Sequence, residues 1–208
     1  MIKKKKVAIV FGLTHDFSFA VASVMMDIKR FSPNMASEIV VIHNGINYKN
    51  QKLLNSNLPT RFIEYDFPIK DTSIFNQKTF VYFSKMVFSK YECLRLLEDY
   101  QNVIWLDYDI VIKKDISELL SKSETGIKMI QSPENPVRKQ LHEPISDYDM
   151  DADGMCGSTF VFQDHLENYM SLYKFCYVSL RKYAKYLHFG EQAIFDFMIQ
   201  EFNLKLQH

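Results

Sequence analysis

The sequence predicts an α/β fold in which a mixed, mostly parallel sheet is flanked by helices. Short β-branched or aromatic runs alternate with longer segments of helical period, which is typical of such sheets. The compact apolar run 103–106 has the character of a central strand. Because 47% of the 208 residues are hydrophobic, the chain can bury a full core, and intrinsic disorder is excluded.

The expected elements follow this alternation along the chain. We expect strands at 7–11, 39–43, 61–65, 103–106, 127–131, 159–162 and 202–206, and helices at 17–29, 81–98, 166–186 and 191–200. The helix over 81–98 is predicted because its apolar residues recur three and four positions apart. The irregular stretch 132–157 holds three of the six prolines, and a loop of this length is usually functional or mobile. No repeat or Pro/Gly-rich linker divides the chain, so one domain over 1–208 is expected.

Charge and cysteine content narrow the function classes. Twenty-five Lys and Arg balance twenty-five Asp and Glu, so no global field draws the protein to nucleic acid or to an anionic membrane. The three cysteines are widely spaced and form no C-x-x-C pair, which argues against a disulfide scaffold or a zinc site. A reducing cytoplasm is therefore the expected compartment.

The N-terminal segment imitates a signal peptide. Lys3–Lys6 precede the apolar run Val7–Leu13, but that run is short, and His15 and Asp16 interrupt the segment. No apolar stretch approaches the roughly 20 residues that a membrane span needs. We expect the lysines to be a solvated leader, with weak peripheral docking to an anionic inner leaflet as the alternative.

An acidic turn, Asp107-Tyr108-Asp109, directly follows the strand at 103–106. Open α/β sheets bind ligands at this carboxyl edge. Two carboxylates one residue apart can converge on one hard cation, and Mg²⁺ or Mn²⁺ held there bridges a diphosphate and stabilises a leaving group. The alternative is a merely solvated turn.

Lys90 lies on the buried stripe of the predicted helix, between Phe83 and Leu97. Burying an ammonium is costly unless it reaches solvent or meets an anion. Two interpretations stay open: a bound diphosphate is that anion, or the lysine stem lies along the sheet and its ammonium is in water.

The segment 103–112, followed by Asp115–Leu120, resembles the D-x-D signature of family 8 glycosyltransferases, the glycogenin-like group. Further pieces resemble that family in the right order. Leu13–Asp16 is similar to its uridine-binding turn, 88–93 to its lysine-bearing helix, and 161–169 with 189–192 to its later segments. The resemblance spans nearly the whole chain and implies a GT-A-like, Rossmann-type fold.

This resemblance implies an enzyme that transfers a hexose, galactose or glucose, from a UDP-sugar to a carbohydrate or glycolipid acceptor with Mn²⁺ or Mg²⁺. It also implies retention at the anomeric carbon. The residues that match the family's site are Asp107 and Asp109 for the metal, Thr14, His15, Asp16, Lys90, Tyr108 and Asp153 for the donor, and Glu191 and Gln192 for catalysis at the sugar. The Lys-led, Ile/Lys/Asn-rich composition suits bacterial surface-glycan assembly, such as lipopolysaccharide biosynthesis.

Three departures from the family pattern stand out. Residues 155–158 replace its F-N-S-G segment, and Glu191 replaces an aspartate that is one methylene shorter. The chain also reaches His208 without the family's C-terminal metal-binding histidine. We expect either a truncated sequence or an enzyme that holds its metal with fewer protein ligands.

The acidic segments are also compatible with other functions. A nucleotide-sugar-binding protein without turnover is the main alternative. Residues 107–111 also fit the D-x-D-x-[TV] start of haloacid-dehalogenase-type phosphatases, but that motif follows the first strand of its fold, and three strands precede it here. Residues 149–154 imitate half of an EF-hand loop, yet its twelfth position is Phe160, so an acidic lip on the cleft is expected instead.

Overall fold

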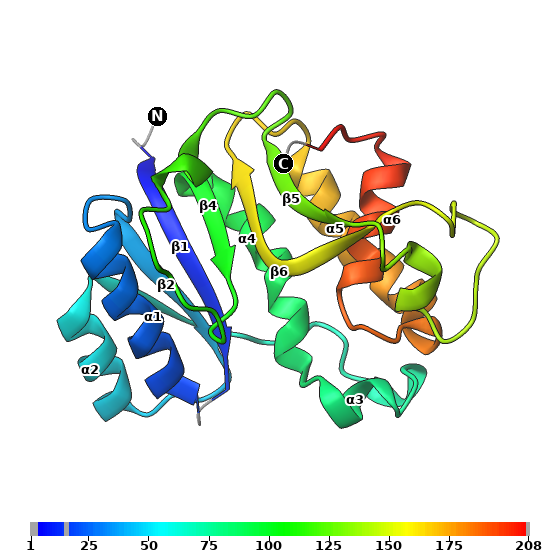
Figure 1. The fold of residues 1–208 in the computed structure, drawn as a ribbon. Coiled ribbons are helices and arrows are strands. Elements are labelled where there is room, and N and C mark those ends of the chain that lie inside the picture. The colour runs from blue at the N-terminus through cyan, green and yellow to red at the C-terminus, as the bar shows by residue number, and fades with distance from the viewer. Residues whose placement is uncertain (1–3, 15–16, 207–208) are drawn as a thin grey trace.

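A computed structural model describes residues 4–14 and 17–206. Within these residues a six-stranded sheet has the order β3-β2-β1-β4-β6-β5 (Figure 1). The strands are β1 (Lys5–Leu13), β2 (Glu38–His43), β3 (Thr60–Glu64), β4 (Tyr100–Leu106), β5 (Ile127–Ser132) and β6 (Gly154–Gln163). β1 pairs in parallel with β2 and β4, and β2 with β3, whereas β6 runs antiparallel to β4 and β5. The predicted mixed, mostly parallel sheet is confirmed.

Helices lie on both faces of this sheet (Figure 1). α1 (Ser18–Phe31) and α2 (Tyr48–Asn57) cover one face of β1–β3, and α4 (Glu92–Arg95), α5 (Tyr169–Tyr183) and α6 (Gln192–Glu201) lie on the opposite face. Alternate residues of β1 and β4 enter different cores: Ile9 and Ile104 pack with α1, while Val10 and Trp105 pack with α4–α6. Both faces are buried, which explains why the central residues of these strands, 7–11 and 103–106, are apolar.

The strand order reverses at β1. β2 and β3 lie on one side of β1, and β4 lies on the other, with Val10 in register with Trp105. The carboxyl ends of β1 and β4 therefore meet at the same edge of the sheet. Open α/β sheets bind ligands in the crevice at such a switch point.

The segment 81–98 is not one helix, and this prediction is wrong. It contains the end of α3 (Thr79–Tyr82), then η3 (Lys85–Tyr91), α4, and η4 (Leu96–Glu98). Phe83 is extended, with φ −117° and ψ 126°, and the Ser84 side chain accepts a hydrogen bond from the Met86 N–H to start the next helix. Apolar residues three apart also align in a 3₁₀-helix, so the spacing did not separate the two geometries. The predicted burial of Lys90 is confirmed.

Two further segments differ from expectation. α2 was not predicted, because Leu54 is its one buried side chain and its ten residues carry no apolar stripe. The Asn47 side chain caps its first turn by accepting a hydrogen bond from the Asn50 N–H. The strand predicted at 202–206 is wrong. Asn203 there adopts a left-handed conformation, with φ 48°, and the Leu204 N–H bonds back to Ile199, so the chain turns directly after α6.

The predicted irregular stretch is shorter than expected, because β6 already begins at Gly154. One 3₁₀ turn, η6 (Val137–Gln140), lies within it. The main chain of the segment is held against α6 at Asp149: its N–H donates to Gln200 Oε1 at 2.8 Å, and Gln200 Nε2 donates to its carbonyl at 3.0 Å. The segment thus packs on the helix that begins just after Glu191.

Asp196, also on α6, makes folding sensitive to pH. It is 3% exposed, and burial raises its pKa well above 3.8 although its Oδ1 accepts the Met155 N–H at 2.9 Å. The folded state therefore holds a proton that the unfolded chain releases above pH 3.8. We expect wild type to lose up to about 1.4 kcal/mol of stability per pH unit through this group, as pH rises from there to the raised pKa.

Denaturant unfolding of wild type and Asp196→Asn across this range tests the effect. The Asn variant keeps the acceptor for Met155 but cannot titrate, so the difference in unfolding free energy between the two proteins should shift in favour of the variant as pH rises. A difference that stays constant with pH would contradict a buried neutral carboxyl.

Candidate active site

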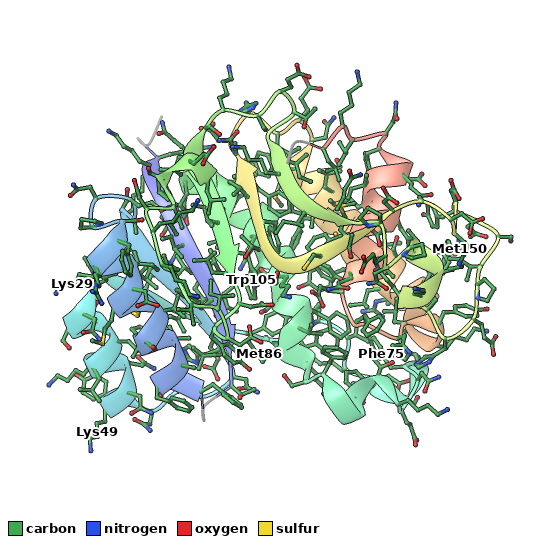
Figure 2. The ribbon with its side chains drawn as sticks, viewed as in Figure 1. Lys29, Lys49, Phe75, Met86, Trp105 and Met150 are labelled. Carbon is green, nitrogen blue, oxygen red and sulfur yellow. The ribbon has the colours of Figure 1, made fainter. Side chains whose placement is uncertain are left out.

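A cavity of about 200 Å³ opens at the carboxyl ends of β1 and β4. It is lined by the end of β1, by residues 83–90 and by the end of β4 with the turn after it. Trp105 and Met86, both labelled in Figure 2, form part of its wall. Gly12 is needed there, since a Cβ at this position would lie 2.5 Å from the Trp105 ring. The cavity therefore occupies the switch point of the sheet.

Asp107, Tyr108 and Asp109 all line this cavity. Asp107 is partly buried and Asp109 is exposed. Asp107 Oδ2 and the Asp109 carboxylate make no hydrogen bond or ion pair with any other residue that the structure describes. Carboxylate oxygens without a protein partner are suitable donors to a hard divalent cation. The acidic turn thus lies at the cavity where the sequence predicts a metal site.

The other oxygen of Asp107 is engaged. Trp105 Nε1 donates a hydrogen bond to Oδ1 at 2.8 Å, and Lys90 Nζ lies 3.4 Å from the same atom. Trp105 and Asp107 are two residues apart on an extended chain, so both side chains point to the same face. Sequence reasoning missed Trp105, although this spacing was a signal that could have found it.

Lys90 is 6% exposed and reaches across to residues far along the chain. Its ammonium lies 2.7 Å from Glu191 Oε1 and donates to the Gly157 carbonyl at 2.9 Å. Burial by itself lowers the pKa of Lys90, but the carboxylates of Glu191 and Asp107 outweigh it and hold that pKa above its usual value. Burial raises the pKa of Glu191, and Lys90 opposes this. Lys90 is therefore a cation between two carboxylates.

Gly157 makes this arrangement possible. A Cβ at this position would lie 2.4 Å from Glu191 Oε1, 3.3 Å from Gln192 Cγ and 3.3 Å from Lys90 Nζ. Any larger residue would push the carboxylate away from the ammonium. The structure thus brings together Lys90, Glu191 and Gln192, three residues that the sequence places in two distant segments.

The opposite side of the cavity holds the turn after β1. Thr14 lines the cavity, whereas His15 and Asp16 lie outside the residues that the structure describes. Phe17 stacks on Tyr108, with ring centroids 5.2 Å apart and planes at 23°. Phe17 is a second residue that sequence reasoning missed as part of the site; its place directly after the turn was the available signal.

Among the predicted donor residues that the structure describes, Asp153 does not join the others. It is exposed in the segment before β6 and is not among the residues that line the cavity. The structure therefore places the acidic turn, Thr14 and Lys90 around one cavity, with Glu191 and Gln192 behind Lys90.

The family model of glycosyl transferase family 8 matches residues 8–208. The chain belongs to this family. It is therefore a glycosyltransferase, and the resemblance seen in the sequence is confirmed. No curated protein sequence matches this family 8 glycosyltransferase.

Solved structures show what the fold is similar to. The galactosyltransferase LgtC, in complex with donor and acceptor sugar analogs, has a TM-score of 0.75 at 13% identity, over 93% of this chain and 71% of LgtC. The bifunctional glycosyltransferase WbbM has a TM-score of 0.67 at 18% identity, over 97% of this chain and 38% of WbbM. Core-mannan synthase A from Aspergillus fumigatus, in a Mn/GDP form, has a TM-score of 0.61 at 9% identity, over 95% of this chain and 70% of the synthase. The predicted GT-A fold of this family 8 glycosyltransferase is confirmed.

Proposed function

We propose that this enzyme transfers a hexose, galactose or glucose, from a UDP-sugar to a carbohydrate acceptor, with Mn²⁺ or Mg²⁺ and with retention at the anomeric carbon. One observation carries the proposal: two carboxylates with free oxygens and a buried ammonium line a single cavity at the switch point of a GT-A sheet. Such a set of charges suits a diphosphate bridged by a divalent cation.

The roles follow from where charge develops. Negative charge grows on the diphosphate as its bond to the anomeric carbon breaks. A divalent cation bound by Asp107 and Asp109 would supply Lewis-acid stabilisation of this charge. Lys90 adds a fixed positive charge at the same wall. Because its ammonium is held by Glu191, Gly157 and Asp107, it stabilises the charge on the diphosphate through its electrostatic field.

The remaining predicted residues divide between nucleotide and sugar. Thr14, His15 and Asp16 hold the uridine, and the stacked rings of Tyr108 and Phe17 offer an aromatic surface beside it.

Asp153, Glu191 and Gln192 stay assigned to the sugar side. Support for Glu191 and Gln192 is their position next to Gly157 and Lys90. Asp153 is supported by the family resemblance alone.

We place the reaction in the cytoplasm, in surface-glycan assembly such as lipopolysaccharide biosynthesis, with a carbohydrate or glycolipid as acceptor. The lysine cluster at 3–6 is the segment suited to peripheral contact with an anionic leaflet. Over the described ranges, the structure contains no helix with the length and apolarity of a membrane span.

Two measurements test this proposal: calorimetric UDP binding and UDP-sugar hydrolysis, each with and without Mn²⁺. We expect both to depend on Mn²⁺. Binding without turnover would instead identify an inactive nucleotide-sugar-binding protein. Activity on phosphate monoesters without UDP binding would identify a phosphatase of the haloacid-dehalogenase type.

A further inference from the structure

Both protein contacts of the Asp107 carboxylate fall on one of its oxygens. Oδ1 accepts the Trp105 indole N–H at 2.8 Å and lies 3.4 Å from the Lys90 ammonium, while the Asp107 main chain is fixed by its N–H bond to the Ser158 carbonyl at 2.9 Å. Oδ2 is left without a partner in the described ranges of the chain. The two oxygens of this carboxylate are therefore in different environments.

The indole of Trp105 has little freedom to turn away from Asp107. The residue is 2% exposed, and its ring stacks on Phe160 with centroids 6.1 Å apart and planes at 4°. Gly12 packs against its far edge, where even a methyl group would clash. The Lys90 ammonium lies 5.5 Å from the ring centroid. Because the ring is packed in this way, its N–H stays directed at Asp107 Oδ1.

The ammonium of Lys90 is equally fixed. It donates hydrogen bonds to Glu191 Oε1 and to the Gly157 carbonyl, and it forms an ion pair with Asp107. Glu191 is 2% exposed and cannot follow a mobile lysine into solvent. Both groups on Oδ1 are thus held in place by their own packing and hydrogen bonds.

We propose that Trp105 is a positioning residue: its indole N–H, together with Lys90, occupies Oδ1 of Asp107 and presents Oδ2 alone to the divalent cation. This inference rests on the proposed function, because it assumes that Asp107 holds the metal. Hydrogen bonds from surrounding residues commonly orient carboxylate ligands in this way. A carboxylate that offers one oxygen suits the near-octahedral geometry of Mg²⁺.

The experiment compares Trp105→Phe with Tyr100→Phe. Trp105→Phe keeps an aromatic ring between Gly12 and Phe160 but removes the N–H. Tyr100 is the matched control, because it also donates from an aromatic side chain on β4 to a carboxylate, Glu38, at the other end of the strand. Mn²⁺ affinity is measured in the presence of UDP from the electron paramagnetic resonance signal of free Mn²⁺. We expect Trp105→Phe to bind Mn²⁺ about tenfold more weakly than wild type, and Tyr100→Phe to match wild type.

Several outcomes would overturn the inference. The first is that Trp105→Phe binds Mn²⁺ within about twofold of wild type, short of the tenfold loss expected of an orienting residue. Trp105 would then not position Asp107, and the proposed function would be unaffected. An equal loss in both variants would show a general loosening of β4. No Mn²⁺ binding by wild type would reject the metal site and this inference together. Should Trp105→Phe not fold, an isosteric tryptophan analogue with sulfur in place of the N–H gives the same comparison.

Discussion

Asp109→Asn is expected to abolish the Mn²⁺ dependence of UDP binding and to reduce sugar transfer by about a thousandfold. Loss of one of two carboxylate ligands removes several kcal/mol of charge stabilisation from the departing diphosphate, and each 1.4 kcal/mol corresponds to about tenfold in rate. Asp109 is exposed and makes no hydrogen bond or ion pair with other described residues, so folding should be unaffected. Calorimetry with UDP and Mn²⁺, beside a transfer assay, measures both effects.

The control for this variant is Asp164→Asn. Asp164 is also an exposed aspartate that directly follows a strand, but it follows β6, next to the start of β4, at the opposite edge of the sheet. It should behave as wild type. Unchanged UDP affinity and activity in Asp109→Asn would mean that the metal is held elsewhere.

Lys90→Met is expected to lose about 3–5 kcal/mol of folding stability, because Glu191 would remain as a buried charge without its partner. Transfer activity should also fall, by about a hundredfold or more, since a fixed positive charge beside the diphosphate is lost. The stability loss should be relieved in the double variant Lys90→Met/Glu191→Leu, because neither ion of the pair remains. Replacing both ions of a buried pair by apolar groups is often neutral for stability, so this variant should fold well and remain inactive.

Urea unfolding and the transfer assay read out the two effects. Lys128→Met provides the matched control. Lys128 is also nearly buried, but its hydrogen-bond partners within the described part of the chain are neutral, namely Ser121 and the Leu119 carbonyl. It should keep full activity. A double variant that regains activity along with stability would show that Lys90 serves the fold alone.

The features that the sequence predicted well depend on local pattern. The strand at 103–106 and the acidic turn after it needed only a compact apolar run followed by Asp107 and Asp109. Local apolar spacing also predicted one helix over 81–98, and this was wrong. An extended Phe83 and the cap by Ser84 divide this segment into short helices. Apolar spacing reports which residues are buried, and it did so correctly for Lys90, but it does not separate an α-helix from a 3₁₀-helix of similar spacing.

Contacts between distant segments could not be read in this way. Lys90 and Glu191 are 101 positions apart, and nothing in either segment alone indicates that their side chains meet. The sequence leaves two interpretations of Lys90 open, a bound diphosphate as its anion or an ammonium in water. The structure shows a protein carboxylate there, made accessible by the missing side chain of Gly157.

What the sequence by itself determined, then, is the alternation of strands and helices, the acidic turn at the end of β4 and the burial of Lys90, since each follows from the order of apolar and polar residues along one segment. The tertiary structure alone decided which oxygen of Asp107 is taken by Trp105 and Lys90, and which carboxylate neutralises that lysine. The physical reason is that hydrogen bonds and ion pairs act over a few ångströms in space, and the sheet sets those distances by bringing β1, β4, β6 and α6 to one edge.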